Sequence, residues 1–381
     1  MKLIHISDIH LGKRLNEYSL AEDQELMIRE ILRAVEEEAP DAVLIAGDVY
    51  DKSVPSGAAV TALDGFLSKL AALVPEIFIV SGNHDSPERL AYLGGLLDSR
   101  GIHISPVYSG EIPPYSLEDE HGSVNLYLLP FVKPREVERY LGGEYPDYNS
   151  AVRAAVEAMN IDASKRNILV THQFVTGASR TESEEISVGG SDNVDAEVFE
   201  IFDYTALGHI HRAQSFLGGK VRYSGSPLKY SFSEANDEKS LTVIELQGKG
   251  ELEIRTLPLK PLHDMRELRG SYSELMSRET YLGKGYAEDY MHLTLTDEDD
   301  IPDAVSKLRV VYKNLMKLDY DNKRTRAVGN TPEELTEEKS PIELFSDFFL
   351  TVNGQQMNDE QRATVVEVLE GIEEKRREGV R

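Results

Sequence analysis

Short apolar segments that end in metal-binding side chains constrain this chain more than any other feature. The first, residues 3–9, ends in Asp8-Ile9-His10, and four later segments end in Gly47-Asp48, Gly82-Asn83-His84-Asp85, Thr171-His172 and Gly208-His209-Ile210-His211. A short apolar run that stops at glycine or polar residues is typical of a buried β-strand. The pattern therefore predicts strands that end in polar loops, each with candidate ligands.

Segments with helical spacing separate the first three of these strands. Strands are expected at residues 3–7, 42–46 and 76–80, and apolar residues recur at helical intervals in residues 20–38 and 57–73. Alternating strands and helices predict a βαβαβ unit with a mainly parallel sheet. Sites in such sheets gather beyond the carboxyl ends of the strands, where the first three donor stretches fall.

The next part of the chain is richer in β-strands. Strands are expected at residues 124–129, 167–171 and 204–207, with a helix at 150–159. Short strands joined by glycine-bearing turns, as antiparallel pairs usually are, are expected at residues 220–224, 241–246 and 252–257. We interpret them as a second sheet packed on the first, which gives residues 1–260 an α/β fold with a two-sheet sandwich.

Beyond Pro258 and Pro261 the pattern changes. Residues 261–325 predict a small α+β domain, and the acidic residues 326–339 predict a linker. The expected strands of the small domain are residues 262–268, 290–296 and 315–320, and its expected helices are residues 273–278 and 304–312. Residues 340–381 predict a helical hairpin, because Ser340, Pro341 and Glu343 are typical of a helix start. Its apolar stripes must be buried either on the chain's own domains or on a partner's helices.

Composition excludes several kinds of site. The chain has no cysteine, so disulfides, thiolate zinc sites and cysteine nucleophiles are excluded. A net charge of −26 argues against a protein that grips nucleic acid by itself. We find neither a signal peptide nor an apolar run near the length of a membrane span, so we expect a cytoplasmic protein without a membrane partner.

The donor types favour hard divalent ions, which bind carboxylate, amide oxygen and imidazole. Two such ions roughly 3.5–4 Å apart can clamp a phosphate if one carboxylate reaches both. Asp48 is the best candidate for that carboxylate, because it ends the middle strand of the first three. One ion would take Asp8, His10 and one of the two histidines His209 and His211, and the other ion would take Asn83, His172 and the remaining histidine.

His84 and Asp85 are the candidate catalytic pair. If Asp85 holds the imidazole, His84 can face the scissile phosphate and stabilise or protonate the leaving oxygen. The alternative is that His84 only supports a ligand. We expect Asp51 to orient a metal-bound histidine.

The ordered set Asp-x-His, Gly-Asp-x-x-Asp, Gly-Asn-His-Asp, His and Gly-His-x-His resembles the calcineurin-like metallophosphoesterase superfamily over about the first 260 residues. Three further stretches, at residues 171–175, 187–194 and 223–232, resemble the nuclease subunits of bacterial SbcC–SbcD complexes. The small domain then resembles that family's capping domain, and the tail resembles the segment that docks on the coiled coil of the partner.

This resemblance implies two manganese ions and cleavage of DNA phosphodiesters, as an exonuclease on double-stranded ends and an endonuclease at hairpins. It also implies a homodimer and assembly with the ATPase SbcC. Local basic residues that could contact DNA are Lys13, Arg14, Arg89, Lys133, Arg135, Arg180 and Lys229.

Two alternatives stay open at this point. The same site could act on a small molecule or a phosphoprotein, although such an enzyme needs neither a capping domain nor a partner-binding tail. The chain could also be a non-catalytic scaffold, but its intact donor set with His84 argues against a dead site.

Overall fold

The computed structural model describes residues 1–184, 193–323, 325, 341–353, 356–358, 361–366 and 368. It contains two compact units, Met1–Glu267 with Glu288–Met291, and Leu268–Ala287 with His292–Arg381. We describe each unit by itself.

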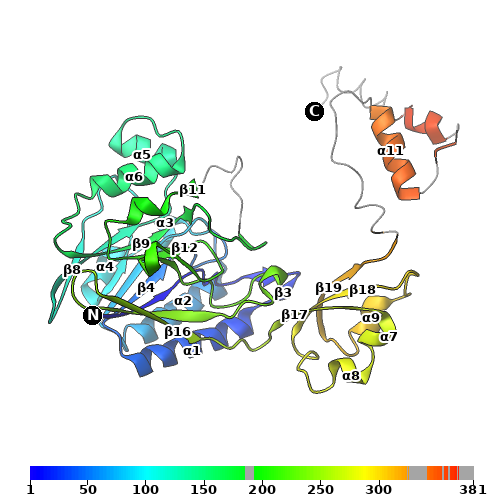
Figure 1. Ribbon diagram of the computed structural model, residues 1–381, viewed down its shortest axis with the longest axis horizontal. Coiled ribbons are helices and arrows are strands. Elements are labelled where there is room, and N and C mark those ends of the chain that lie inside the picture. Colours follow the sequence, from blue (N-terminus) through cyan, green and yellow to red (C-terminus); the bar gives the residue numbers. More distant parts are fainter. Residues whose placement is uncertain are drawn as a thin grey trace. The chain divides into compact units, whose positions relative to one another are not determined.

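The first unit is built on two six-stranded sheets (Figure 1). One has the order β16 (Leu252–Pro258), β15 (Ser240–Leu246), β1 (Lys2–Ile6), β4 (Ala42–Ala46), β5 (Glu76–Val80), β6 (Ile102–Ile104). The strands β1, β4, β5 and β6 are parallel, which confirms the expected βαβαβ unit. Their carboxyl ends therefore lie at one edge of the sheet, where the candidate ligands follow.

Two amphipathic helices connect these parallel strands. Helix α1 (Ala21–Glu38) buries Met27, Ile31 and Val35, which recur every four residues along one face. Helix α2 (Gly57–Leu70) is capped by Ser56, whose hydroxyl accepts a hydrogen bond from the Ala59 N–H. Both helices occur where the apolar spacing predicts them, although α2 ends earlier than expected.

The second sheet has the order β13 (Gln214–Phe216), β14 (Val221–Tyr223), β12 (Tyr204–Gly208), β9 (Arg166–His172), β8 (Gly122–Leu129), β7 (Tyr115–Asp119). Its four central strands are parallel, and its two edge pairs are antiparallel. Helices α5 (Pro134–Leu141) and α6 (Tyr148–Ala158) pack on one face through a core that includes Val137, Val152 and Leu169.

The main core lies between the two sheets. Alternate side chains of both sheets meet there, including Leu44, Phe78, Leu126 and Val170. Each such buried side chain stabilises the fold by about 1.5–3 kcal/mol relative to exposure. The two-sheet α/β sandwich expected from the sequence is confirmed.

One part of the expected topology is wrong. Strands β15 and β16 extend the first sheet rather than the second, and β14 lies in the second sheet but runs parallel to β12. The pairing of β15 with β1 matches Lys2 to Glu245 and His5 to Thr242. Partners so far apart in sequence leave no local pattern, so strand type was predictable and sheet membership was not.

Short elements complete the first unit. They are β2 (Arg14–Leu15), β3 (Tyr18–Ser19), α3 (Pro87–Leu90), α4 (Gly94–Leu97), β10 (Phe174–Val175), β11 (Asn193–Val194), and the 3₁₀ turns η1 (Asp98–Arg100), η2 (Ala196–Phe199), η3 (Leu217–Gly219) and η4 (Phe232–Glu234). The sequence patterns predicted none of these, because each is too short to show a period.

The expected α+β segment forms a three-stranded sheet with the order β17 (Met265–Gly270), β18 (Tyr290–Leu295), β19 (Asn314–Tyr320). Short helices α7 (Tyr272–Leu275), α8 (Arg278–Tyr281) and α9 (Ala304–Leu308) accompany it. The three strands and their order along the chain are confirmed. The expected linker, residues 326–339, lies outside the described residues.

In the tail, helix α11 (Pro341–Asn353) starts at the predicted proline. It exposes Phe348, and residues 361–366 are also helical. Leu369 and Ile372, which we expected on the stripe of the second helix, lie outside the described residues. Across the part of the chain that the structure describes, no helix combines the length and apolarity needed to cross a membrane.

Candidate metal centre and active site

The loops that follow five strand ends converge in the first unit. The loops after β1, β4 and β5 carry the candidate ligands contributed by the first sheet. The ends of β9 and β12 carry those contributed by the second sheet. The structure brings together all of the predicted ligands and the predicted catalytic histidine, namely Asp8, His10, Asp48, Asn83, His84, His172, His209 and His211. The site therefore lies at one edge of both sheets, as expected for strands that end in the same direction.

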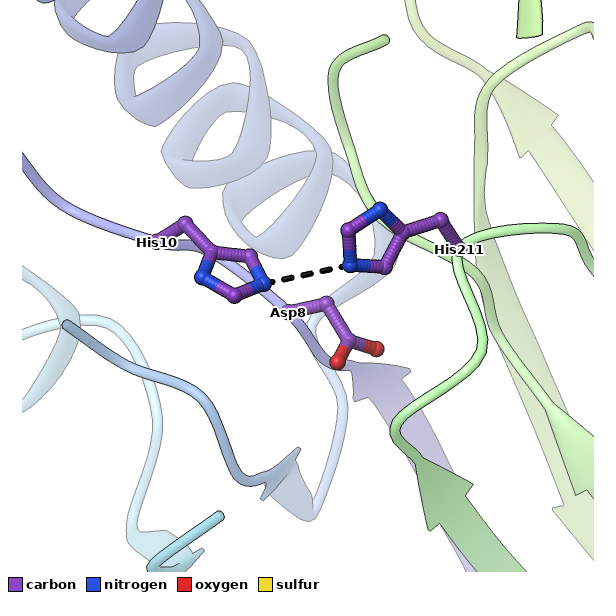
Figure 2. A group of neighbouring side chains, drawn as sticks. All are labelled: Asp8, His10 and His211. Carbon is purple, nitrogen blue, oxygen red and sulfur yellow. Dashed lines mark hydrogen bonds between the residues drawn. The ribbon is translucent and has the colours of Figure 1, made fainter. Parts of the chain in front are cut away.

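One group consists of Asp8, His10 and His211, whose potential ligand atoms all lie within 4.8 Å of one another (Figure 2). The Nε2 atoms of the two rings are 3.1 Å apart. Asp8 accepts a hydrogen bond from the His209 N–H through Oδ1, while its buried Oδ2 has no hydrogen-bond partner among the described residues. A buried acceptor without a donor is costly, and a cation would satisfy it.

A second group consists of Asn83, His172 and His209. Asn83 Oδ1 lies 3.0 Å from His172 Nε2 and 2.9 Å from His209 Nδ1. The Nδ1–H of His172 donates to the Ala46 carbonyl at 2.8 Å, so Nε2 is the ring nitrogen that faces the amide oxygen. One amide oxygen and two ring nitrogens therefore converge on a common point, where they could serve as ligands of one cation.

Asp48 lies between the two groups. Its Oδ2 is 3.3 Å from His172 Nε2 and 3.7 Å from His10 Nε2. Burial alone would raise the pKa of Asp48, but the neighbouring His172 and His10 hold that pKa well below its usual range. Conversely, burial opposes the charged form of His172, but Asp48 and Asp8 raise the pKa of His172 to about 9. Each partner thus favours the charge of the other.

The backbone of four predicted ligands is left-handed. The φ angles are 54° at Asp8, 48° at His10, 48° at Asp48 and 102° at His209. This region costs a residue with a side chain roughly 1–2 kcal/mol. Four of the eleven non-glycine residues with positive φ in the described chain are thus predicted ligands, and strain of this kind is typical of functional sites.

Two glycines allow the sheets to approach closely at this edge. A Cβ at Gly208 would lie 1.8 Å from the Ala46 carbonyl oxygen and 2.6 Å from His172 Nδ1. A Cβ at Gly82 would lie 2.1 Å from Asp48 Oδ1. The glycines beside the ligands therefore serve close approach as well as turning.

His84 borders the same cluster, with its Nε2 4.0 Å from Asp48 Oδ2. Its Nδ1–H donates to the backbone carbonyl of Asp51 at 3.1 Å. The expectation that Asp85 holds this imidazole is wrong, because both oxygens of Asp85 accept backbone N–H groups, from Val49, Tyr50 and Gly82. Burial and the charge of Asp48 raise the pKa of Asp85 to about 6. Asp85 thus fixes the two loops rather than the ring.

The side chain of Asp51 lies near a ring that we expected it to orient. Its Oδ1 is 3.8 Å from His10 Nδ1, which is too long for a hydrogen bond, and 2.8 Å from Lys13 Nζ. Asp51 therefore reaches His84 through its backbone and Lys13 through its side chain.

The donor chemistry fits divalent ions. The two groups offer carboxylate and amide oxygens with imidazole nitrogens, which suit such ions, and they contain no thiolate. Asp8 Oδ2 without a donor and facing ring nitrogens fit cations better than an internal hydrogen-bond network. Asp48 is the carboxylate that touches both groups.

Several of the basic residues that we considered for DNA contact are engaged within the chain. Lys13 pairs with Asp51, and Lys229 pairs with Asp264 at 2.7 Å. The guanidinium of Arg180 lies 3.6 Å from the centre of the Phe174 ring. Most of the motif at residues 187–194 lies outside the described residues, which resume at 193.

Sequence reasoning missed four residues that surround His211. Glu184 accepts a hydrogen bond from the His211 N–H at 2.7 Å, and Lys239 donates to the His211 carbonyl. Ser183 Oγ lies 2.7 Å from His211 Nδ1, and Glu234 Oε1 lies 3.6 Å from the same atom. They come from two loops distant from His211 in the sequence. No spacing rule connects them, so only the folded chain reveals them.

Comparison with known proteins agrees with this geometry. Residues 1–213 match the calcineurin-like phosphoesterase family, and residues 261–353 match a family described as type 5 capsule protein repressor C-terminal domain. The SbcD component of the SbcCD nuclease of Staphylococcus epidermidis is 34% identical over 323 residues, which cover 84% of this chain and 85% of that protein.

Two solved structures show a distant likeness. TT1561 of Thermus thermophilus is 14% identical, and a dimetal phosphatase from Danio rerio is 12% identical; each match covers 67% of this chain and 98% of the other, with a TM-score of 0.37. A likeness this distant does not identify a family. The two family matches and the bacterial relative do identify one. The chain therefore belongs to the calcineurin-like phosphoesterase family and, within it, to the SbcD family of SbcCD nucleases.

Proposed function

We propose that this chain is a metal-dependent DNA nuclease that hydrolyses phosphodiester bonds as the SbcD component of an SbcC–SbcD complex. The observation that carries the proposal is the position of Asp48, whose Oδ2 lies within 4 Å of His10, His84 and His172. One carboxylate between two ligand groups is what a phosphate clamp of two ions requires.

The two groups suggest a definite assignment of ligands. Asp8, His10 and His211 would hold one ion, and Asn83, His172 and His209 the other, with Asp48 shared between them. His209 and His211 thus serve different ions. Manganese is our proposal for both, because the resemblance to SbcD nucleases implies it and the hard carboxylate and amide oxygens of this set suit it.

When bound, two divalent ions would polarise the scissile phosphate and provide a nucleophilic water at neutral pH. His84 supplies a group that the ligands do not. Because the Asp51 carbonyl can only accept, Nδ1 of His84 keeps its hydrogen and Nε2 is the atom that exchanges a proton. When protonated, Nε2, which lies 4.0 Å from Asp48 Oδ2, can donate its hydrogen to the leaving oxygen.

We further propose DNA ends and hairpins as substrates, with both exonuclease and endonuclease activity, and a homodimer as the working state. SbcC would bind the C-terminal helices, since α11 exposes Phe345, Phe348 and Leu350. A partner that contributes basic surface would also compensate for the net charge of −26. The proposed division is a nuclease domain at 1–260, a capping domain at 261–325, a linker at 326–339 and the partner-binding hairpin at 340–381.

The test is cleavage of an end-labelled hairpin DNA with manganese, with and without SbcC. We expect wild-type cleavage, and loss of cleavage by factors of about 10² or more in Asp48→Ala and His84→Gln. Asp64→Ala and His121→Gln are matched controls, because both residues are exposed and lie outside the site. Both controls should cut like the wild type.

Two results would contradict the proposal. Hydrolysis of bis-p-nitrophenyl phosphate without cleavage of any DNA would favour a small substrate. DNA cleavage that survives both site substitutions would show that the chemistry lies elsewhere.

A further inference from the structure

The ring of His211 is held on the side that faces away from His10. Its Nε2 faces His10 Nε2, and its Nδ1 points in the other direction (Figure 2). Nδ1 lies 2.7 Å from Ser183 Oγ, which in turn lies 2.7 Å from Glu234 Oε1. A chain of hydrogen bonds therefore runs from the imidazole through a hydroxyl to a carboxylate.

That carboxylate is part of a buried ion pair. Glu234 is fully buried, and its Oε2 lies 2.6 Å from Lys239 Nζ. Lys239 is also buried, and it donates to the His211 carbonyl at 2.8 Å and to Ser226 Oγ at 2.9 Å. The ammonium favours the ionised form of Glu234, because a buried charge is stable only when it is paired.

The ionised carboxylate determines where the hydrogens of the chain lie. A carboxylate only accepts, and the Tyr230 N–H, which only donates, also points at Oε1 at 3.2 Å. Each of the three atoms 2.7 Å from Ser183 Oγ must share a hydrogen with it, and Glu234 has none to give, so the Ser183 hydroxyl donates to Glu234 and its oxygen accepts from the Thr181 hydroxyl and from His211. Nδ1 of His211 then carries the hydrogen, and Nε2 of the neutral ring keeps its lone pair.

We propose that the Glu234–Lys239 pair, acting through Ser183, sets the tautomer of His211 that leaves Nε2 free to bind a cation. The inference rests on the proposed function in taking His211 as a metal ligand. It adds three positioning residues to that site. Hydrogen bonds of this kind orient ligating histidines and raise their basicity.

The other candidate ligands have no comparable arrangement in the described part of the chain. A backbone carbonyl, that of Ala46, holds His172, and His10 Nδ1 has no hydrogen-bond partner among the described residues. The tautomer of His211 depends on side chains that are not themselves candidate ligands. It can therefore be changed by substitution without altering the backbone.

Glu234→Gln tests the inference with almost no change in shape. The amide oxygen must face the Lys239 ammonium, because a hydrogen bond from a charged donor is stronger than the neutral one from Tyr230. The amide NH₂ then faces Ser183, so the hydroxyl accepts from it and, with the Thr181 hydroxyl still donating to the same oxygen, donates to His211 Nδ1. Hydrogen moves to Nε2, which blocks the lone pair that the ion needs.

The measurement is the binding of Mn²⁺ by the full-length protein, with free Mn²⁺ counted by electron paramagnetic resonance. The wild type should bind two ions. Glu234→Gln should bind one with unchanged affinity and the other about 10- to 100-fold more weakly. Ser231→Ala is the matched control: Ser231 also donates to Glu234 Oε1, at 3.0 Å, but is not in the chain to His211, so both ions should bind as in the wild type.

A rescue separates this role from a structural one. In the double variant Glu234→Gln with Lys239→Met, the amide is free to turn its oxygen to Ser183 and Tyr230, so the second Mn²⁺ should bind again. Ser183→Ala, at a half-buried position, provides a second test if Glu234→Gln folds poorly, and it should weaken one ion only. Two ions bound at wild-type affinity by both Glu234→Gln and Ser183→Ala would overturn the inference, and so would the absence of rescue. A wild-type protein that binds two ions but does not cut DNA would refute the proposed function alone.

Discussion

Gly208→Ala is the substitution that best tests whether the two sheets jointly build the site. Gly208 ends β12 and pairs in register with His172 on β9. A methyl group there would lie 1.8 Å from the Ala46 carbonyl oxygen, which accepts the hydrogen bond from His172. The substitution should therefore displace Ala46 at the end of β4, in the other sheet, and disturb the orientation of His172.

The cost follows from these contacts. The methyl carbon and the oxygen must separate by roughly 1 Å or more to reach a normal contact, and neither belongs to a flexible side chain. Overpacking in a core costs about 1–3 kcal/mol. Loss of the buried hydrogen bond from His172 to Ala46 costs about 1–3 kcal/mol more. We expect a total of about 2–6 kcal/mol, which lowers the thermal midpoint by roughly 10 °C.

The assay is thermal unfolding of the metal-free protein together with Mn²⁺ binding. Gly65→Ala is the matched control, because Gly65 lies within α2 with no atom within 4 Å of the added methyl. Helix propensity should make that variant more stable by about 0.5–1 kcal/mol. A Gly208→Ala protein with an unchanged midpoint and two tightly bound ions would refute the reasoning.

Three further predictions concern polar groups outside the set of proposed ligands. Burial lowers the pKa of His5 to about 3, against 6.5 as the reference value, so the unfolded chain takes up a proton first as the pH falls and stability drops by up to about 1.4 kcal/mol per pH unit between these values. Urea unfolding of the wild type and His5→Gln at pH 6.5 and 4.5 checks this, and equal pH slopes for both would contradict it. Asp85→Asn should lose at least one of the three hydrogen bonds that Asp85 accepts from backbone N–H groups, which lowers the free energy of unfolding by about 1–3 kcal/mol. Urea unfolding at pH 7 measures this loss, and an unchanged free energy would show that the loops hold without the carboxylate. Asp119→Asn should cost up to about 3 kcal/mol, because Arg166 is 3% exposed and would lose its charged partner, and a change below about 0.5 kcal/mol would argue that its carbonyl acceptors suffice.

The sequence predicts the strands of the first sheet well where burial is complete. Residues 42–46 and 76–80 have the observed bounds of β4 and β5, because parallel strands covered on both faces read as continuous apolar runs. The same rule places the candidate ligands, since residues just after parallel strands share one edge. The convergence of Asp48 and His172 from different sheets needed the further expectation of a sandwich.

Other features depend on contacts that no spacing encodes. The partner of His84 Nδ1 is a backbone carbonyl, which every residue possesses, so the identity of Asp85 beside it was misleading. The strand β15 pairs with β1, although most of the sequence of the first unit separates the two strands. Glu234 contacts His211 through Ser183. These contacts join residues far apart in the sequence, so only the folded structure shows which groups become partners.

Backbone hydrogen bonds of the fold hold the strained ligand loops. Beyond β1 and β4 the backbone hydrogen bonds continue into these loops, with the Asp8 N–H donating to the Gly47 carbonyl at 3.0 Å and the His10 N–H to the Asp48 carbonyl at 2.9 Å. Each bond contributes about 0.5–1.5 kcal/mol, which is close to the roughly 1–2 kcal/mol that a left-handed residue costs. The core between the sheets then keeps both strand ends in place. Because these backbone hydrogen bonds position Asp8, His10 and Asp48, we expect the binding of ions to require little further ordering of the loops.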